Sequence, residues 1–259
     1  MKRPKFSVVT PSLNQGTFIE DAIRGVQSQS YPSVEHIVVD GGSTDRTLEV
    51  LGSYPDVRWS SEPDKGQSDA INKGFRAAEG DIVSWCNTDD YYLPNAFESV
   101  ANAFAASAAD VVYGEIIYVT QDKEPIRHKK EHRFDVKTLL YYGCYIPSTS
   151  TFFSRRIIDD GELLDVDLKV AMDYEYFLRL ASKGYKFAHL PQPLAAFRLQ
   201  ETNAGKRYEH LWRGEVSRVQ DRYGAVRYET SVLTTAARSI LRFGYKAKRQ
   251  FLKFSTQRP

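Results

Sequence analysis

Two adjacent acidic residues, Asp89 and Asp90, follow the short apolar segment 81–85, which has the composition of a buried strand. Carboxylate oxygens are the ligands that hard divalent cations prefer, and such cations also accept substrate phosphates in their remaining coordination positions. The alternative is an Asx-type turn, because Asn and Asp side chains bond readily to their own backbone. The pair by itself therefore leaves a metal site and a turn both open.

Acidic residues also follow two other predicted strands. Asp40 ends the strand 36–40, and Asp64 lies in a polar loop after a short strand at 57–59. Ligands collect at the carboxyl ends of strands in an open α/β sheet, so these acids together suggest a nucleotide-plus-metal site at one sheet edge. The chain lacks Gly-x-Gly-x-x-Gly after its first strand and lacks a Gly-Lys-Ser phosphate loop. Neither a dinucleotide-binding fold nor an NTPase is therefore supported.

The segments that position these acids alternate between strand and helix. Residues 6–10 are rich in β-branched types, residues 18–26 carry apolar side chains at helical spacing, and residues 36–40 are again strand-like. Strand, helix and strand in this order form a βαβ unit, which implies parallel pairing and a right-handed crossover. Further helices are predicted at 48–51, 71–78 and 97–104.

From Asp110 the pattern changes. Residues 111–113 and 116–119 are strand-like without an intervening helix, which predicts antiparallel or mixed pairing. The other predicted segments are a polar loop at 127–133, a helix at 136–142, a strand at 151–153, a helix starting near 155, an amphipathic helix at 173–180, two short strands flanking 191–193, and a helix at 212–223.

Composition limits the class of protein. With 259 residues, 42% of them hydrophobic, the chain can form one large α/β domain, or one domain with an appendage. A net charge of +2 does not indicate a nucleic-acid binder. Cys86 and Cys144 form neither a disulfide framework nor a zinc set and suit a reducing compartment. No apolar run has the length of a signal peptide or membrane span, so we expect a cytoplasmic protein, with peripheral attachment to the inner face of the cell membrane left open.

The last segment is basic, and no acid follows Glu229. Apolar residues recur three and four apart at Leu233, Ala237, Ile240, Gly244, Ala247, Phe251 and Phe254, and basic residues lie opposite at Arg238, Arg242, Lys246, Arg249 and Lys253. This pattern predicts a basic amphipathic helix in a tail, 230–259, appended to a domain over 1–229. Such helices bind anionic membrane surfaces, here through residues 233–254. The alternative is a helix packed on the domain with its charges solvated.

Four motifs occur in an order that resembles family 2 glycosyltransferases of the GT-A fold, the type that builds bacterial cell-surface polysaccharides. The motifs are Val8-Val9-Thr10-Pro11-Ser12-Leu13-Asn14, Val38-Val39-Asp40-Gly41-Gly42-Ser43-Thr44-Asp45, Asp64-Lys65-Gly66-Gln67-Ser68-Asp69-Ala70-Ile71-Asn72-Lys73-Gly74 and Trp85-Cys86-Asn87-Thr88-Asp89-Asp90. The resemblance covers residues 5 to about 200. It implies an α/β fold with a Rossmann-like, mixed but mainly parallel sheet flanked by helices, followed by a C-terminal helical extension.

The resemblance also implies roles for individual residues. The implied donor-binding residues are Thr10, Pro11, Ser12, Asn14, Asp40, Asp64, Lys65, Asp89 and Arg198. Asp40 matches the acid that contacts the nucleotide base. Asp89 and Asp90 match the metal motif, in which the second acid binds a divalent cation, Mn²⁺ or Mg²⁺, that bridges the diphosphate. Many members have Asp-Asp-Gly-Ser where this chain has Asp40-Gly41-Gly42-Ser43, so the base preference stays open.

The family's general base lies at the start of a later helix. Here Asp173 takes that place in Met172-Asp173-Tyr174-Glu175, with Met172 replacing the usual preceding acid. A helix cap is the alternative role for Asp173, and Glu175 is the second candidate for the base. Arg198 matches a basic position near the phosphates, and a surface arginine is its alternative.

The function implied is that of an inverting glycosyltransferase. It moves a sugar from a nucleotide-diphosphate donor, with a UDP-sugar favoured, to a hydroxyl of a cell-surface glycan or lipid-linked acceptor. Retention by double displacement would require a carboxylate nucleophile, for which the family gives no precedent. Sugar specificity is expected in loops such as 127–133 and 143–150. The alternatives are a sugar nucleotidyltransferase, whose glycine-rich basic loop the segment 11–16 lacks, and a catalytically inactive relative that binds nucleotide sugar at the membrane.

Overall fold

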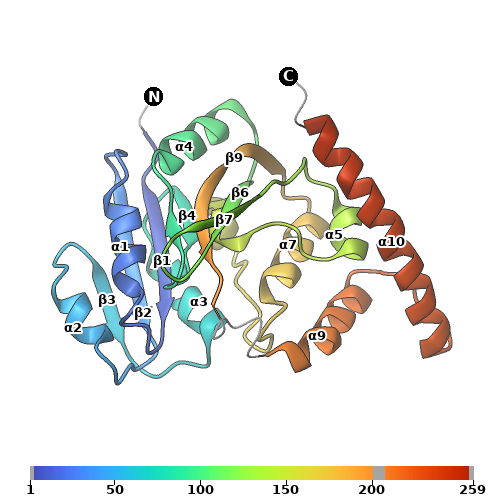
Figure 1. Ribbon diagram of the computed structural model, residues 1–259, viewed down its shortest axis with the longest axis horizontal. Helices are drawn as coiled ribbons and strands as arrows, with labels where there is room; N and C mark the ends of the chain where they lie inside the picture. Colours follow the sequence, from blue (N-terminus) through green and yellow to red (C-terminus); the bar gives the residue numbers. More distant parts are fainter. Residues whose placement is uncertain (1–2, 201–207, 257–259) are drawn as a thin grey trace.

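A single mixed sheet runs through the protein. The computed structural model describes residues 3–200 and 208–256 (Figure 1). Within these ranges the strand order is β3-β2-β1-β4-β8-β6-β9-β5, and β7 pairs with β6. The strands are β1 Phe6–Ser12, β2 Val34–Asp40, β3 Arg58–Ser61, β4 Ile82–Trp85, β5 Tyr91–Tyr92, β6 Val111–Val119, β7 Pro125–Lys129, β8 Thr151–Ser154 and β9 Phe187–Arg198. The helices are α1 Ile19–Gln27, α2 Thr47–Gly52, α3 Gln67–Ala77, α4 Ala96–Ala106, α5 Val136–Tyr142, η1 Ser148–Ser150, α6 Arg155–Asp159, α7 Met172–Ser182, α9 Glu209–Arg222 and α10 Ser231–Thr256.

The N-terminal half of the sheet is parallel, which confirms the predicted βαβ arrangement. β1 lies between β2 and β4, and Val8 is in register with His36 on one side and with Ser84 on the other. β3 continues the parallel pairing beside β2. Because the four strands point the same way, the loops after β1, β2 and β4 lie at one edge of the sheet.

The C-terminal half is mixed, as predicted, but two predicted segments were wrong. β8 is antiparallel to both β4 and β6, while β9 is parallel to β6. Residues 125–129 were predicted to belong to a turn and a polar loop. They form the strand β7, because the edge of β6 is available for antiparallel pairing. The two short strands expected around Pro191–Pro193 are one strand, β9. Its register against β6 shifts near Glu115, and such a bulge accommodates prolines that cannot donate a ladder hydrogen bond.

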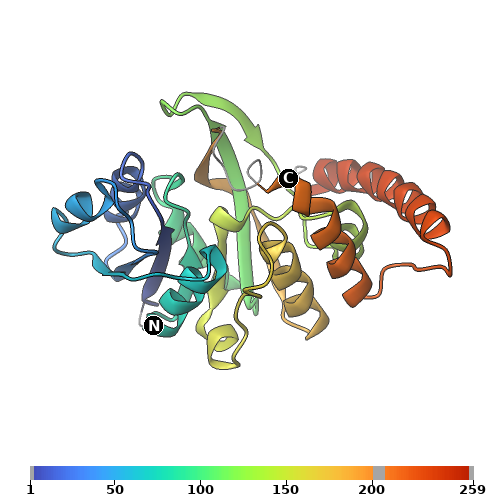
Figure 2. The ribbon, with the colours of Figure 1, turned by 90° about the horizontal axis from the view of Figure 1, so that it is seen from below.

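Helices cover both faces of the sheet, as the side views in Figures 1 and 2 show. The helices α3 and α7 pack on one face around Val9, Phe75 and Trp85. The other face is covered by α1 and α4, whose core includes Phe97. Adjacent residues of β1 point to opposite cores, Val8 to the second and Val9 to the first. The sheet is therefore buried on both sides, which explains its near-continuous apolar strands.

The close fit of α3 on the sheet depends on Gly74. A Cβ atom at this position would lie 2.3 Å from a methyl carbon of Val9. Only glycine lets the helix backbone approach β1 this closely. This contact fixes how closely the C-terminal part of α3 packs on β1.

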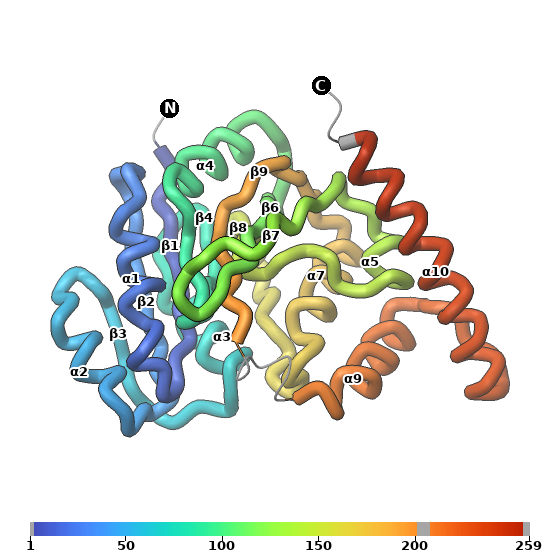
Figure 3. The backbone as a smooth tube through the Cα atoms, in the orientation of Figure 1, coloured from blue at the N-terminus to red at the C-terminus, as the bar shows by residue number. Residues whose placement is uncertain are grey.

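The long helix α10 runs along the margin of the molecule, at the end opposite α2 (Figure 3). It packs against α5. The ring of Tyr245 in α10 stacks on the ring of Tyr141 in α5, with the ring centroids 5.3 Å apart. Among the helices described, none has both the length and the apolar character needed to cross a membrane.

Candidate active site

The loops after β1 and β2 form one unit at the carboxyl edge of the sheet. The side-chain oxygen of Asn14 accepts a hydrogen bond from the backbone N–H of Thr44 (2.8 Å), and the N–H of Asn14 donates to the Ser43 hydroxyl (2.7 Å). The N–H of Gly16 donates to the Asp45 carboxylate. Asn14 has φ of 52°, a conformation that Asn tolerates better than most residues. These bonds hold the exposed side of the loop next to Asp40 and its neighbours.

Asp40 lies beneath this unit rather than on its surface. It is fully buried, and its carboxylate accepts hydrogen bonds from Gly42 N–H, Ser43 N–H, the Ser43 hydroxyl and the Ser61 hydroxyl. Both carboxylate oxygens are therefore already engaged within the protein. Asp40 therefore stabilises the conformation of the loop after β2. This role differs from the contact with the nucleotide base that was expected for Asp40.

Asp64 reaches the same loop from the other side. A Cβ atom placed on Gly41 would lie 2.7 Å from Asp64 Oδ2, so the Asp64 carboxylate occupies the space that a side chain at position 41 would need. The other oxygen, Oδ1, accepts from the Gly66 N–H (2.7 Å). The chain thus has a carboxylate next to position 41 although residue 41 itself carries none. Lys65 is exposed, and its carbonyl accepts from the Lys169 ammonium.

The residues at the end of β1 are more deeply buried than the sequence indicated. The Thr10 hydroxyl lies 2.8 Å from His36 Nε2, and burial lowers the pKa of His36 to about 4, so the imidazole is neutral. Pro11 and Ser12 are also buried. The Ser12 hydroxyl has no hydrogen-bond partner among the described residues. Of the four positions expected at the nucleotide pocket, only Asn14 is exposed.

The two acids of the central pair have different surroundings. Asp90 is fully buried, and its carboxylate accepts from the Thr149 hydroxyl (2.6 Å), the Arg198 N–H (3.0 Å) and the Asn87 amide. Asp89 is partly exposed, and its carboxylate accepts from the Gln200 amide (2.6 Å). Burial raises the pKa of both carboxyls, and the charge of Asp89 further raises the pKa of Asp90. Asp89 is therefore the more exposed residue of the pair, and Asp90 is the more buried one.

This pair suits a divalent cation. Burial disfavours two adjacent negative charges, and a hard cation with oxygen ligands offsets that cost. Over residues 3–200 and 208–256, no group of three or more His, Cys, Asp or Glu side chains is placed to hold a metal ion by itself. The protein thus provides one or two carboxylates, and a bound diphosphate would have to complete the coordination.

The side chain of Arg198 is buried and bonded to other residues of the protein. Its side chain is almost fully buried, and its guanidinium pairs with Asp21 (2.6 Å), donates to the Asp89 carbonyl (2.8 Å) and bonds to the Gln121 carbonyl. The ring of Phe18 lies against it. These contacts join the acidic loop to α1 and to the turn after β6. They differ from the phosphate contact expected for Arg198.

Asp173 lies in the first turn of α7, one residue after its start. Its Oδ1 accepts from the Tyr174 N–H (2.7 Å), and the Cys144 thiol lies 3.7 Å from its Oδ2 and donates to it. Burial raises the pKa of Asp173 above the usual aspartate range, and burial together with the charge of Asp173 raises the pKa of Cys144. The N-cap of α7 is Ala171, so Asp173 is not the capping residue. It is a carboxylate with an unusually high proton affinity at a helix start.

Glu215 of α9 fixes the turn before Asp173. It is buried, and its carboxylate accepts from the N–H groups of Lys169 (3.0 Å), Val170 (2.9 Å) and Ala171 (3.0 Å). An anion at a helix N-terminus satisfies backbone donors that would otherwise lack partners. The sequence gives no signal for this role, because Glu215 is about 40 residues from Asp173 and nothing local in the sequence links them.

Two loops connect Asp173 to the acidic pair. The loop before β8 contacts Asp173 through Cys144 and Asp90 through Thr149. At the start of α3, the Gln67 amide donates to Asn87 (2.7 Å), and the Ser68 hydroxyl donates to the sulfur of Met172. These contacts link the start of α7 and the start of α3 to the loop that carries the acidic pair. Thr149, Cys144 and Gln67 were not predicted as site residues, although the loop 143–150 was singled out for specificity.

Glu175 has a different role. It is 1% exposed, and its carboxylate accepts from Arg179 (3.1 Å) and from the Tyr223 hydroxyl (2.5 Å). Arg179 also pairs with Glu162. Glu175 is thus part of a buried ion-pair network that holds α7 and α9 together, and it is not placed as a base.

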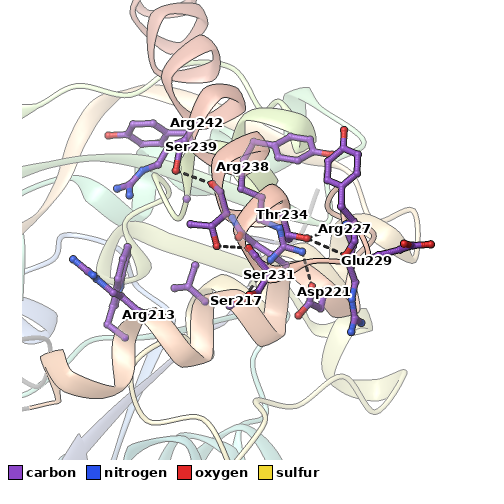
Figure 4. Close-up of a pocket in the computed structure, with 18 residues that line it drawn as sticks. Arg213, Ser217, Asp221, Arg227, Glu229, Ser231, Thr234, Arg238, Ser239 and Arg242 are labelled. Carbon is purple, nitrogen blue, oxygen red and sulfur yellow. Dashed lines mark hydrogen bonds and ion pairs between the residues drawn. The ribbon is translucent and has the colours of Figure 1, made fainter.

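A cavity of about 810 Å³ lies away from this edge, between α9, α10 and residues 141–143 (Figure 4). Arg238 spans its wall and pairs with Asp221, while Arg213 and Arg242 line another side. Arg242 lies over the ring of Trp212. The cavity is separate from the acidic edge, and its wall is rich in cations.

Comparisons with known proteins agree on one family. The family model described as Glycosyl transferase family 2 matches residues 7–192. An uncharacterized glycosyltransferase of Mycobacterium tuberculosis is 30% identical over 183 residues, which cover 69% of each chain. The putative teichuronic acid biosynthesis glycosyltransferase TuaG of Bacillus subtilis is 26% identical over 205 residues, covering 76% of this chain and 80% of TuaG.

Solved structures share the fold. Staphylococcus aureus TarS 1-349, in complex with UDP-GlcNAc, superposes with a TM-score of 0.70 at 18% identity, over 93% of this chain and 71% of that one. The mannosyltransferase PcManGT from Pyrobaculum calidifontis, in complex with GDP-Man and Mn²⁺, superposes with a TM-score of 0.63 at 19% identity, over 95% of this chain and 74% of that one.

Proposed function

This chain belongs to glycosyl transferase family 2 and has the GT-A fold, and from that premise we propose that it is a metal-dependent, inverting glycosyltransferase. The donor is a nucleotide-diphosphate sugar, and the acceptor hydroxyl belongs to a cell-surface or lipid-linked glycan. The observation that supports this proposal is that the loop before β8 contacts Asp173 through Cys144 and Asp90 through Thr149, and so links Asp173 to the acidic pair. The naming of TuaG for teichuronic acid biosynthesis supports a cell-surface acceptor.

The nucleotide base binds, in this proposal, between the loops after β1 and β2. Asp64 is the acid that faces it, because the absence of a side chain at Gly41 leaves room for the Asp64 carboxylate. Asp40 holds the loop from below through its four hydrogen bonds. A UDP-sugar is the favoured donor, supported by the UDP-GlcNAc complex of TarS, while PcManGT was solved with GDP-Man.

Asp89 is the residue that holds the divalent cation, with Asp90 supporting it from behind. Exposure supports this assignment, since Asp89 is partly exposed and Asp90 is fully buried. When bound there with the diphosphate, Mn²⁺ or Mg²⁺ supplies Lewis-acid stabilisation of the departing nucleoside diphosphate. Thr149 and Arg198 hold Asp90 in place through its two carboxylate oxygens.

Asp173 is the general base. Its carboxylate accepts the proton of the acceptor hydroxyl as the oxygen attacks the anomeric carbon, on the side opposite the diphosphate. Burial raises the pKa of Asp173, and a raised pKa strengthens the ionised carboxylate as a base. One displacement of this kind inverts the anomeric centre. Glu215 and Cys144 position Asp173, through the turn before α7 and through the thiol contact.

We expect UDP to bind the purified chain in the presence of Mn²⁺ and to bind more weakly, by about tenfold or more, after the metal is removed with EDTA. Isothermal titration with UDP, GDP and dTDP, each with and without Mn²⁺, measures this and identifies the base. Failure of all three to bind with Mn²⁺ would contradict the donor proposal. Binding without any transfer would favour a catalytically inactive relative.

A matched pair of variants tests the metal assignment in the same titration. Asp89→Asn should abolish most of the metal-dependent gain in UDP affinity, because the amide has lost the charge that attracts the cation. Asp122→Asn changes an exposed acid in the turn after β6 and should leave the titration unchanged. Full metal dependence in Asp89→Asn would reject Asp89 as the ligand.

Transfer should also depend on pH through Asp173. The base acts only when ionised, so the rate should fall as pH decreases through its pKa, which burial places above the usual aspartate value of about 3.9. The thiol of Cys144 stabilises the ionised form, so Cys144→Ala should move this acid limb to higher pH. A kcat/KM profile at saturating Mn²⁺ measures both. An unmoved limb in Cys144→Ala would show that the thiol does not act on Asp173.

A further inference from the structure

The helix α10 packs on the domain with its basic side. Arg249 makes two hydrogen bonds of 2.7 Å to the fully buried carboxylate of Glu131, and its guanidinium lies over the ring of Tyr142. Lys248 pairs with Asp135 (2.7 Å). The sequence alone suggested the opposite arrangement for a packed helix, in which the apolar side faces the domain and the charges are solvated.

The apolar side of α10 consequently faces outward. The exposed fractions are 57% for Leu233, 73% for Ile240, 77% for Phe243, 71% for Phe251 and 73% for Phe254. At 3.6 residues per turn these five residues, here called the outer stripe, fall on the side of the helix opposite Arg249. The outer stripe runs for roughly 32 Å at 1.5 Å per residue. Scattered exposed apolar residues are ordinary, but an aligned stripe with three phenylalanines indicates a binding surface.

Lys246 is the unpaired cation beside the outer stripe, since it is exposed, lies about one turn from Phe243 and forms no ion pair within the part of the chain that the structure describes. Arg213, Arg227 and Arg242 also form no ion pair there, but they line the α9–α10 cavity on the domain side of the helix (Figure 4). No acidic residue follows Glu229 in the sequence. The surface is therefore apolar along its centre and cationic at its side.

We propose that α10 is a membrane-docking helix, which lies in the plane of an anionic lipid bilayer with its outer stripe among the acyl chains near the headgroups. Helices with Phe and Leu on one side and Lys and Arg beside them bind such interfaces. The ion pairs of Arg249 and Lys248 hold α10 to the rest of the protein, so that docking of the helix docks the whole domain.

Charge favours a membrane over a second copy of the chain. Two outer stripes packed against each other would bring Lys246 of both copies close together, without an acid on either helix to neutralise them. Anionic headgroups neutralise the same cations. The proposal goes beyond the transferase function, and its test needs no nucleotide sugar.

Vesicle flotation with the full chain tests the proposal. We expect binding to vesicles of phosphatidylglycerol and phosphatidylethanolamine, and weaker binding to vesicles of phosphatidylcholine alone. A triple variant, Phe243→Ser with Phe251→Ser and Phe254→Ser, should reduce partitioning to the anionic vesicles by about tenfold or more. Lys246→Gln should reduce the preference for anionic lipid.

The control changes exposed apolar residues elsewhere, Trp59→Ser with Ile126→Ser, and should leave vesicle binding unchanged. The three phenylalanines are exposed, so the triple variant should keep the circular dichroism spectrum and melting temperature of the wild type. Sedimentation without lipid measures self-association. The proposal is overturned by a wild type that stays off anionic vesicles, by a triple variant that binds them like wild type, or by a dimer that depends on the outer stripe and does not bind lipid.

Discussion

Replacing Asp173 by asparagine is expected to slow sugar transfer by about 10²–10⁴-fold, the usual contribution of a general base. The amide is nearly the same size, but it cannot accept the proton of the acceptor hydroxyl. Donor binding should survive, because the contacts proposed for the nucleotide come from Asp64 and Asp89. The measurement is steady-state product formation, together with titration of UDP and Mn²⁺.

The same variant should not lose stability. The pKa of Asp173 is raised in the folded state, so the folded protein binds this proton more tightly than the unfolded chain does. Its contribution to stability is therefore present at low pH and is lost as pH rises through the folded-state pKa. At neutral pH the buried charge opposes folding, and Asp173→Asn should unfold at the same urea concentration as wild type or a higher one.

Glu175→Gln is the matched control, because Glu175 lies two residues away in the same helix. It should lower the urea midpoint, since Arg179 and Arg222 lose their buried carboxylate partner. The folded fraction should retain transfer. If instead Glu175→Gln abolishes transfer in a folded protein and Asp173→Asn does not, the base has been assigned to the wrong residue.

Replacing Arg198 by glutamine is expected to lower the free energy of unfolding by about 3–5 kcal/mol, the cost of breaking a buried ion pair on one side. The guanidinium joins Asp21 to the carbonyls of Asp89 and Gln121, and glutamine cannot reach all three. The Arg198 guanidinium also holds the backbone of Asp89, so its loss should displace the proposed metal ligand and lower the affinity for UDP with Mn²⁺. Urea unfolding and titration calorimetry measure the two effects.

The contrasting role for Arg198 is direct contact with the donor phosphates. In that case affinity for the donor would fall while stability stayed at the wild-type value. Arg58→Gln is the control, because Arg58 is on an edge strand and its exposed hydrogen bond to the Ala77 carbonyl should contribute little. If Arg198→Gln is as stable as Arg58→Gln, Arg198 does not stabilise the fold and the proposed structural role is wrong.

The parallel half of the sheet could be predicted from the sequence because its signals are local. Apolar strands of a few residues alternate with helices at regular spacing, and connections of that length permit only parallel pairing with one hand. The C-terminal half was harder. β7 forms only because β6 provides an edge, and β9 passes through two prolines only because a bulge near Glu115 absorbs them. Neither condition is local in the chain.

The candidate site divides in the same way. The sequence predicted Asp64, Asp89 and Asp173 as site residues, since each stands near the end of a strand or the start of a helix within a motif of the family. Which oxygens stay accessible was decided by residues far away in the chain. Thr149, which is 59 residues from Asp90 in the sequence, donates a hydrogen bond to its carboxylate. Asp21, which is 177 residues from Arg198, accepts one from its guanidinium.

The helix α10 shows this division most clearly. Its sequence determined, by the period of its apolar and basic residues, that it is an amphipathic helix with two unlike sides. Which side faces the protein depends on partners that the helix does not contain. Glu131 and Asp135 lie in the loop between β7 and α5, and Asp221 lies on α9; the fold brings their carboxylates to the basic side of α10. The tertiary structure therefore decided that the basic side of α10 forms ion pairs with the domain and that its apolar side faces outward.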